Sequence, residues 1–62
     1  MKITLKDIRT LRGYSTQKMA EILGISPKIY KFYEMHPHFI PADVAIKISV
    51  VGHISLDYIF FG

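Results

Sequence analysis

Residues 16–34 read TQKMAEILGISPKIYKFYE, and the pattern of this stretch decides the fold. Its apolar residues recur at the spacing of two short helices, with Gly24 between them. A tight corner between helices commonly needs a positive φ, which glycine adopts without strain. The side chains expected to point inward are Met19, Leu23, Ile25, Tyr30 and Tyr33. This layout is that of a helix-turn-helix.

Capping residues mark where two helices begin: one that precedes residues 16–34, and the first helix of that stretch. Thr4 precedes an apolar helical pattern, and Asp7 three residues later completes a weak capping box. This first helix should end at Gly13, and Ser15 caps the helix that follows. The chain therefore places one helix ahead of the helix-turn-helix.

Serine and proline positions divide the rest of the chain. Ser26 caps the third helix, with Pro27 at its first position, and this helix should run to about Glu34. Pro37 prevents a smooth continuation. A loop and two further helices are expected over residues 35–40, 41–51 and 56–61. An alternative is a strand pair near the C-terminus, because β-favouring residues gather at Ile46, Ile48, Val50, Val51 and Ile54.

Length and composition limit the protein to one small domain over residues 1–62. Half of the residues are apolar and none is cysteine, so stability must come from efficient helix packing or from burial against a second subunit. Charged residues interrupt the N-terminus, and no apolar run approaches the roughly 20 residues of a membrane span. We therefore expect a cytoplasmic protein with no membrane partner.

Basic residues concentrate in the first half of the chain. Residues 1–34 hold seven of the eight basic residues and three of the five acids, a net charge of +4. Residues 35–62 hold one base and two acids, a net charge of −1. This asymmetry suits a domain that meets a polyanion on one side. The total of +3 alone is also that of an ordinary protein surface.

Further motifs extend the pattern over almost the whole chain: IR at 8–9, GYSTQKMAEILGIS at 13–26, YKFYE at 30–34, Pro41, and ISLDYIFFG at 54–62. Through them the chain resembles the phage Cro and cI repressor family of DNA-binding domains, also called the xenobiotic-response-element family. The resemblance implies an all-α, compact five-helix, lambda-repressor-like bundle. It also implies that double-stranded operator DNA is bound with the third helix in the major groove.

The same resemblance implies roles for individual residues. Thr16 stands where the family often has a glutamine that anchors a phosphate, and Gln17 beside it could take over that role at a helix N-terminus. Arg9 and Glu34 match a structural ion pair between the first and third helices. The groove-facing positions of the third helix are Pro27, Lys28, Ile29, Lys31 and Phe32.

Apolar residues late in the chain exceed what so small a core needs, which suggests self-association. The residues we assign to such a surface are Phe39, Leu56, Ile59 and Phe60. Many members of the family dimerise around the position of Leu56. A homodimer would place its recognition helices about 34 Å apart on a palindromic site. The alternative is that the fifth helix plugs the core through Tyr58 or Ile59.

The third helix departs from the family in having no Gln, Asn or Arg, the usual bidentate readers of bases. Lys28 and Lys31 share one face and can reach phosphates or a guanine edge, whereas Ile29 and Phe32 offer an apolar pair. That pair suits thymine methyl groups or another protein, and the alternative for Ile29 is a place in the core. Two hypotheses follow: a Cro-like repressor, or a protein-interaction module such as an antirepressor or antitoxin-like partner.

Enzyme and metal chemistry find little support in the residues. His36 and His38 lie in a predicted loop that contains no cysteine and no carboxylate, and Asp43 is the first carboxylate after it, so we expect no metal site. Each serine and aspartate has a capping or surface explanation, and 62 residues offer little pocket. We therefore expect no catalytic residue, no cofactor and no small-molecule substrate.

Overall fold

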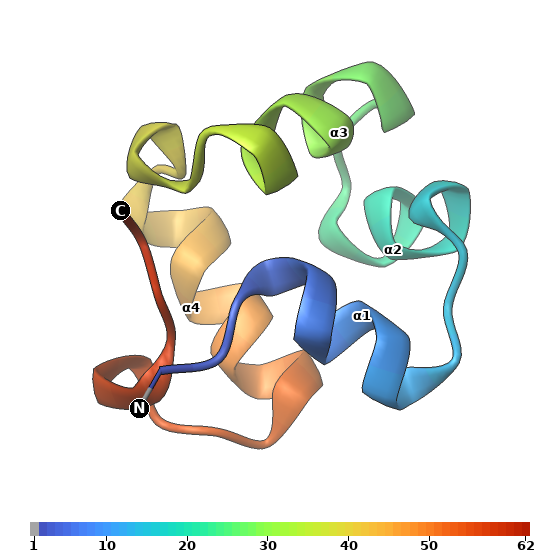
Figure 1. The fold of residues 1–62 in the computed structure, drawn as a ribbon. Coiled ribbons are helices and arrows are strands. Elements are labelled where there is room, and N and C mark those ends of the chain that lie inside the picture. The colour runs from blue at the N-terminus through green and yellow to red at the C-terminus, as the bar shows by residue number, and fades with distance from the viewer. Residues whose placement is uncertain (1) are drawn as a thin grey trace.

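The computed structural model describes residues 2–62, and in this range the chain folds into four α-helices around one core (Figure 1). The helices are α1 (Leu5–Arg12), α2 (Thr16–Leu23), α3 (Pro27–Met35) and α4 (Ala42–Gly52). Two 3₁₀ turns follow α3 and α4, namely η1 (Pro37–Phe39) and η2 (Leu56–Tyr58). The predicted all-helical class is confirmed, but the described residues contain four helices instead of five.

Local hydrogen bonds explain where the first helices begin and end. Thr4 Oγ1 accepts from the Asp7 N–H at 3.1 Å, and Asp7 Oδ2 accepts from the Thr4 N–H at 3.0 Å. The backbone hydrogen bond from Thr4 stabilises the carboxylate and so lowers the pKa of Asp7. Gly13 and Gly24 end α1 and α2, each with a φ of 73°. The predicted capping box and both glycine ends are confirmed.

The core collects residues from every α-helix and from the C-terminal segment. Its buried members, none more than 5% exposed, are Leu5, Ile8, Met19, Ala20, Leu23, Tyr30, Val44, Ile48 and Ile59. Ile25 and Tyr33 pack against this cluster while partly exposed. The predicted inward face of the helix-turn-helix therefore lies against the core.

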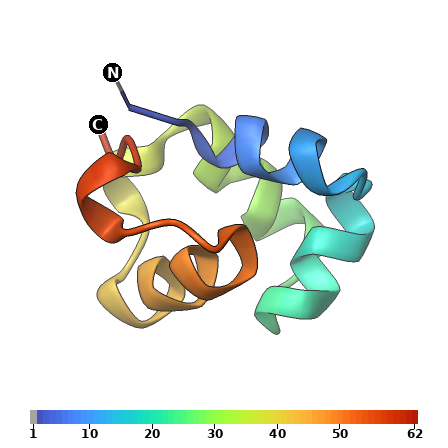
Figure 2. The same cartoon turned by 90° about the horizontal axis from the view of Figure 1, so that it is seen from below.

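The C-terminal segment differs from the predicted fifth helix. Ser55 does cap a helical turn, by accepting from the Asp57 N–H, but η2 ends at Tyr58. The chain then extends, and Ile59 forms an isolated parallel bridge with Ile3. Ile3 donates to the Tyr58 carbonyl at 2.7 Å and accepts from the Phe60 N–H at 2.8 Å. Figure 2 shows the first and last segments of the chain at one edge of the molecule.

The physical reason for this difference is that burial alternates from one residue to the next after η2, which the spacing of a helix does not produce. Ile59 is buried, Phe60 is exposed and Phe61 is partly buried, which is the period of two expected for extended backbone. The alternative of a strand pair near the C-terminus is wrong for the described residues, because α4 is helical to Gly52 and buries Val44 and Ile48 on one face, and the bridge of Ile3 with Ile59 is isolated. Among the described residues, no helix has the length and apolar character needed to cross a bilayer.

Candidate nucleic-acid interface

The turn between α2 and α3 sets the relation of the two helices. The Ser15 hydroxyl accepts from the Lys18 N–H at 3.0 Å at the start of α2. After the left-handed Gly24, the Ile25 N–H returns to the Ala20 carbonyl at 3.0 Å. Ser26 then caps α3 by accepting from the Ile29 N–H at 3.1 Å. These local bonds satisfy the ends of both helices and hold the corner at one angle.

The outer face of α3 presents the side chains that the sequence places there. Tyr30 is fully buried and Tyr33 is partly buried, so these two fix which face of α3 turns inward. The five residues at the groove-facing positions are all exposed: Pro27, Lys28, Ile29, Lys31 and Phe32. Among the described residues this face therefore stays accessible, and a partner can reach it.

The start of α2 lies within the same helix-turn-helix. Gln17 is exposed in the first turn of α2, while Thr16 before it is half-buried. Peptide N–H groups at a helix start carry partial positive charge and attract phosphate. Of these two residues, Gln17 therefore has the more accessible side chain for a phosphate contact.

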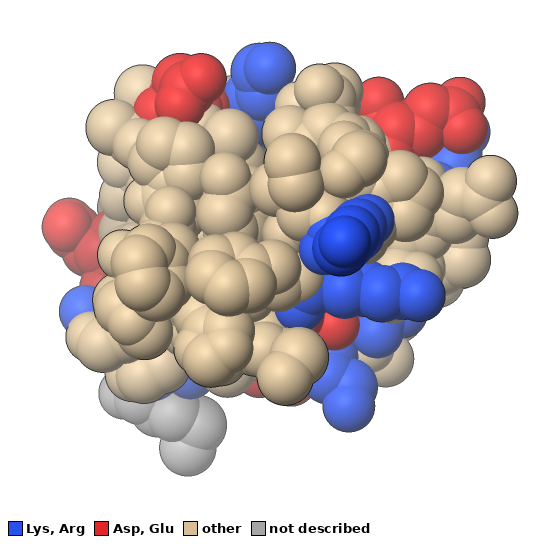
Figure 3. Space-filling model, turned by 90° about the horizontal axis from the view of Figure 1, so that it is seen from above, with Lys and Arg blue, Asp and Glu red and all other residues tan. Residues whose placement is uncertain are grey.

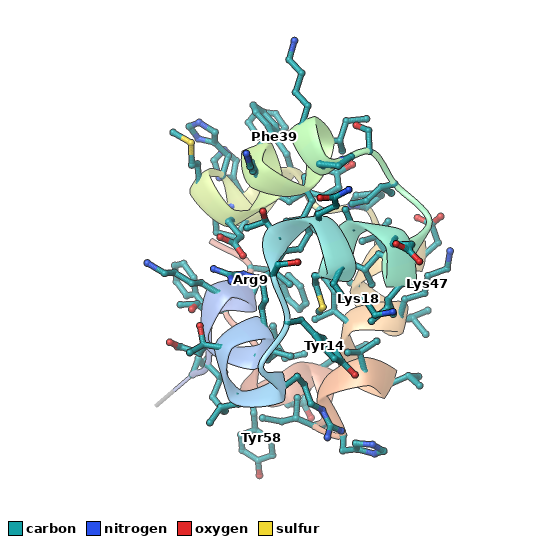
Figure 4. All side chains as sticks on the ribbon, turned by 90° about the vertical axis from the view of Figure 1, so that its right-hand side faces the viewer. Arg9, Tyr14, Lys18, Phe39, Lys47 and Tyr58 are labelled. Atoms are coloured by element: carbon teal, nitrogen blue, oxygen red, sulfur yellow. The ribbon has the colours of Figure 1, made fainter. Side chains whose placement is uncertain are left out.

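An ion pair ties α3 to α1. Arg9 Nε donates to Glu34 Oε2 at 2.7 Å, and the two side chains are only 17% and 14% exposed. The hydrogen bond with Glu34 raises the pKa of Arg9, so its guanidinium stays charged. Arg9 Nη1 also donates to the Tyr14 carbonyl at 3.0 Å. Figure 4 shows Arg9 between α1 and the helix-turn-helix, where it fixes the position of α3.

The Tyr30 hydroxyl lies buried close to this ion pair. Among the described residues it has no hydrogen-bond partner of acceptable geometry, although the charges of Glu34 and Arg9 both affect its pKa. Burial, followed by the Glu34 carboxylate, raises the pKa of Tyr30 because both disfavour a phenolate. Tyr30 is therefore neutral in the folded protein, and its hydroxyl carries a desolvation cost.

An aromatic cluster extends the face of α3 into η1, and sequence reasoning did not find it. The Phe32 ring centroid lies 4.9 Å from that of His36 and 5.3 Å from that of Phe39, and His38 lies 4.4 Å from Phe39. The four-residue spacing of Phe32 and His36 could have indicated the first contact. The contact with Phe39 depends on how η1 folds back after α3.

Of the residues assigned to self-association, one lies in the core and three are exposed. Ile59 is 1% exposed in the core, so the expectation that it meets a second chain is wrong, and the alternative that it plugs the core is correct. Phe39 lies against Phe32 and is 57% exposed. Leu56 and Phe60 are 41% and 42% exposed and remain available.

Charge is unevenly distributed over the α3 side of the molecule. Figure 3 looks down on this side and shows most Lys and Arg side chains at the centre right, acidic side chains at the upper edges and the left edge, and mainly uncharged residues over the left and centre. The uncharged part faces the end of the molecule where η1 lies in Figure 1. Within residues 2–62, no group of three or more His, Cys, Asp or Glu side chains is placed to hold a metal ion.

Comparisons with known proteins point to the same motif. The chain is 36% identical over 58 residues to the SPbeta prophage-derived uncharacterized HTH-type transcriptional regulator YonR of Bacillus subtilis. It is 38% identical over 47 residues to proteins of Pyrococcus furiosus and of Pyrococcus abyssi that are named as HTH-type transcriptional regulatory proteins.

The extent of these matches differs. The match to YonR covers 94% of this chain but 54% of that protein, and each Pyrococcus match covers 76% of this chain and 15% of the relative. No family model matches the chain, and no solved structure matches it with significance. The similarities support a helix-turn-helix domain of the kind found in HTH-type transcriptional regulators, whose names describe no enzyme activity.

Proposed function

We propose that the protein is a DNA-binding transcriptional regulator, a Cro-like repressor that binds a palindromic operator as a dimer. The observation that carries the proposal is the exposed outer face of α3 in a capped helix-turn-helix, within a chain similar to YonR over 94% of its length. In such a motif the second helix enters the major groove and its N-terminal residues reach base edges.

Phosphate contacts would supply most of the affinity. Lys28 and Lys31 are exposed on α3, and Gln17 is exposed at the start of α2. Each phosphate that a lysine neutralises releases counterions, so binding should weaken steeply with salt. The ion pair of Arg9 with Glu34 links α3 to α1. In the proposed complex it would hold α3 so that the two lysines and Gln17 reach the DNA backbone together.

Dimerisation rests on the exposed apolar residues that remain at the C-terminal end. Leu56 and Phe60 are each about two-fifths exposed. A two-fold dimer through this surface would present two copies of α3 to half-sites about 34 Å apart. Sedimentation of Phe60→Glu against the unaltered protein tests this, and a monomeric mass for the unaltered protein both free and on DNA would exclude the dimer.

Selection from random DNA duplexes tests the proposed function directly. We expect one enriched sequence with two-fold symmetry, bound roughly 10³-fold or more tighter than random duplex at physiological salt. Lys28→Ala should weaken binding to all sequences and lower the slope of log affinity against log salt by about one. Lys6→Ala on the exposed side of α1 is the matched control and should leave the slope unchanged.

A second function is favoured by the apolar character of α3. Ile29 and Phe32 are exposed to 45% and 43%, and a protein-interaction module on the same fold would use them against a protein partner. This alternative predicts that random selection enriches no duplex. It also predicts that Phe32→Ala abolishes binding to the protein partner and leaves any non-specific DNA binding intact.

A further inference from the structure

The exposed face of α3 contains no Arg, Asn or Gln, whose planar groups form two directed hydrogen bonds to a base. Its exposed residues are Pro27, Lys28, Ile29, Lys31, Phe32 and Met35. The acidic residue of α3, Glu34, is engaged by Arg9, and the Ser26 hydroxyl is engaged in the helix cap. Only lysine remains as a donor to base edges from this helix, and lysine acts as a flexible point charge.

One of the two apolar side chains on this face, Phe32, packs against neighbouring rings before any partner arrives. Phe32 has ring contacts with His36 at 4.9 Å and with Phe39 at 5.3 Å, yet 43% of the residue stays exposed. Ile29 lies one turn nearer the start of α3 and is 45% exposed. Because the Phe32 ring is already ordered, contact with a partner costs little additional rotamer entropy.

We infer that this protein reads its operator chiefly through thymine C5-methyl groups, which Ile29 and Phe32 contact in the major groove. The inference rests on the proposed function and names the base that its recognition helix selects. The thymine methyl is the apolar group that distinguishes the base pairs in the major groove, and it matches the chemistry of these two side chains. Lys28 and Lys31, exposed on the same helix beside Ile29 and Phe32, favour a polyanion as the partner of this face.

The spacing of the two side chains suits neighbouring base pairs. Residues three apart on a helix are separated by about 4.5 Å along its axis. Successive base pairs are about 3.4 Å apart along DNA. Ile29 and Phe32 would therefore meet thymines on adjacent steps, so each half-site should contain a short run of thymine or alternating thymine and adenine.

Replacing thymine by deoxyuridine tests this inference with the unaltered protein. The change removes the C5-methyl and keeps every hydrogen-bonding group of the base. In the duplex obtained by selection, we expect about fourfold weaker binding for each contacted methyl, corresponding to roughly 0.8 kcal/mol per buried carbon group. Uracil elsewhere in the same duplex should be neutral. Replacing a contacted thymine by 5-methylcytosine should weaken binding less than unmodified cytosine does.

Variants then assign the methyl contacts to residues. Ile29→Ala and Phe32→Ala should each lose the preference for thymine over uracil at one position of the duplex. Val50→Ala, at an exposed apolar residue of α4, should keep the preference for thymine at every contacted position. Circular dichroism confirms that each variant is folded. Uracil that is neutral at every position of a selected operator overturns the inference and leaves the proposed function standing. A failure to enrich any duplex overturns both.

Discussion

Replacing Glu34 by glutamine removes one charge from the ion pair that ties α3 to α1. In the folded protein, Glu34 Oε2 lies 2.7 Å from Arg9 Nε, and both side chains are more than four-fifths covered. Glutamine keeps the size and a carbonyl acceptor but leaves the guanidinium without its counter-charge. Arg9 would retain its hydrogen bond to the Tyr14 carbonyl. The substitution therefore isolates the charge from the packing.

The expected loss follows from the burial of the pair. A hydrogen bond to a charged group contributes about 1.5–3 kcal/mol to stability. Breaking a fully buried pair costs about 3–5 kcal/mol, and an exposed pair contributes about 1 kcal/mol or less. The Arg9–Glu34 pair is only slightly exposed, so we expect a loss of about 2 kcal/mol in the free energy of unfolding. A chain of this length has about 3–9 kcal/mol in total.

Thermal and urea unfolding followed by circular dichroism measure this loss. A loss of about 2 kcal/mol should lower the melting temperature by about 8–16 °C in a domain this small. Glu21→Gln, the same change at an exposed position of α2, is the matched control and should alter stability by about 0.5 kcal/mol or less. Replacing Arg9 and Glu34 together by methionine should recover most of the loss. Equal stability of the Glu34→Gln and Glu21→Gln proteins would refute the reasoning.

Further substitutions test the interior and the helix cap. Tyr30→Phe removes a buried hydroxyl without a partner, so unfolding experiments should show unchanged stability or a gain of up to about 1 kcal/mol. Folding raises the pKa of Tyr30 above its unfolded value near 10, so the free energy of unfolding is unaffected below that pH and falls as the pH rises beyond it. This fall should be smaller in Tyr30→Phe. Ile59→Ala should cost about 2–5 kcal/mol by urea titration, whereas Phe60→Ala should cost about 1 kcal/mol or less. Because the pKa of Asp7 is lowered in the folded protein, its carboxylate contributes fully to stability above about pH 4 and the contribution is lost in stronger acid. The difference in stability between the unaltered protein and Asp7→Asn should therefore disappear in stronger acid.

Much of the fold was predictable because helix ends depend on neighbouring residues. The capping box of Thr4 with Asp7, and Ser26 followed by Pro27, act over three or four residues, so their spacing alone predicts where α1 and α3 begin. Helical periodicity likewise predicts that Tyr30 turns inward while Ile29 and Phe32 turn outward. The outer face of the candidate site was for this reason identified before any tertiary contact was known.

Contacts between distant segments decided the rest. The expected fifth helix became a single 3₁₀ turn because Ile59 gains burial and a bridge to Ile3, which comes from the other end of the chain. The ordering of Phe32 by Phe39 depends on the path of η1 in the same way. Residues 56–61 form a segment so short that its sequence is compatible with both a helix and an extended conformation. The surface against which they pack chooses between these two conformations, and that surface exists only once the helices have assembled.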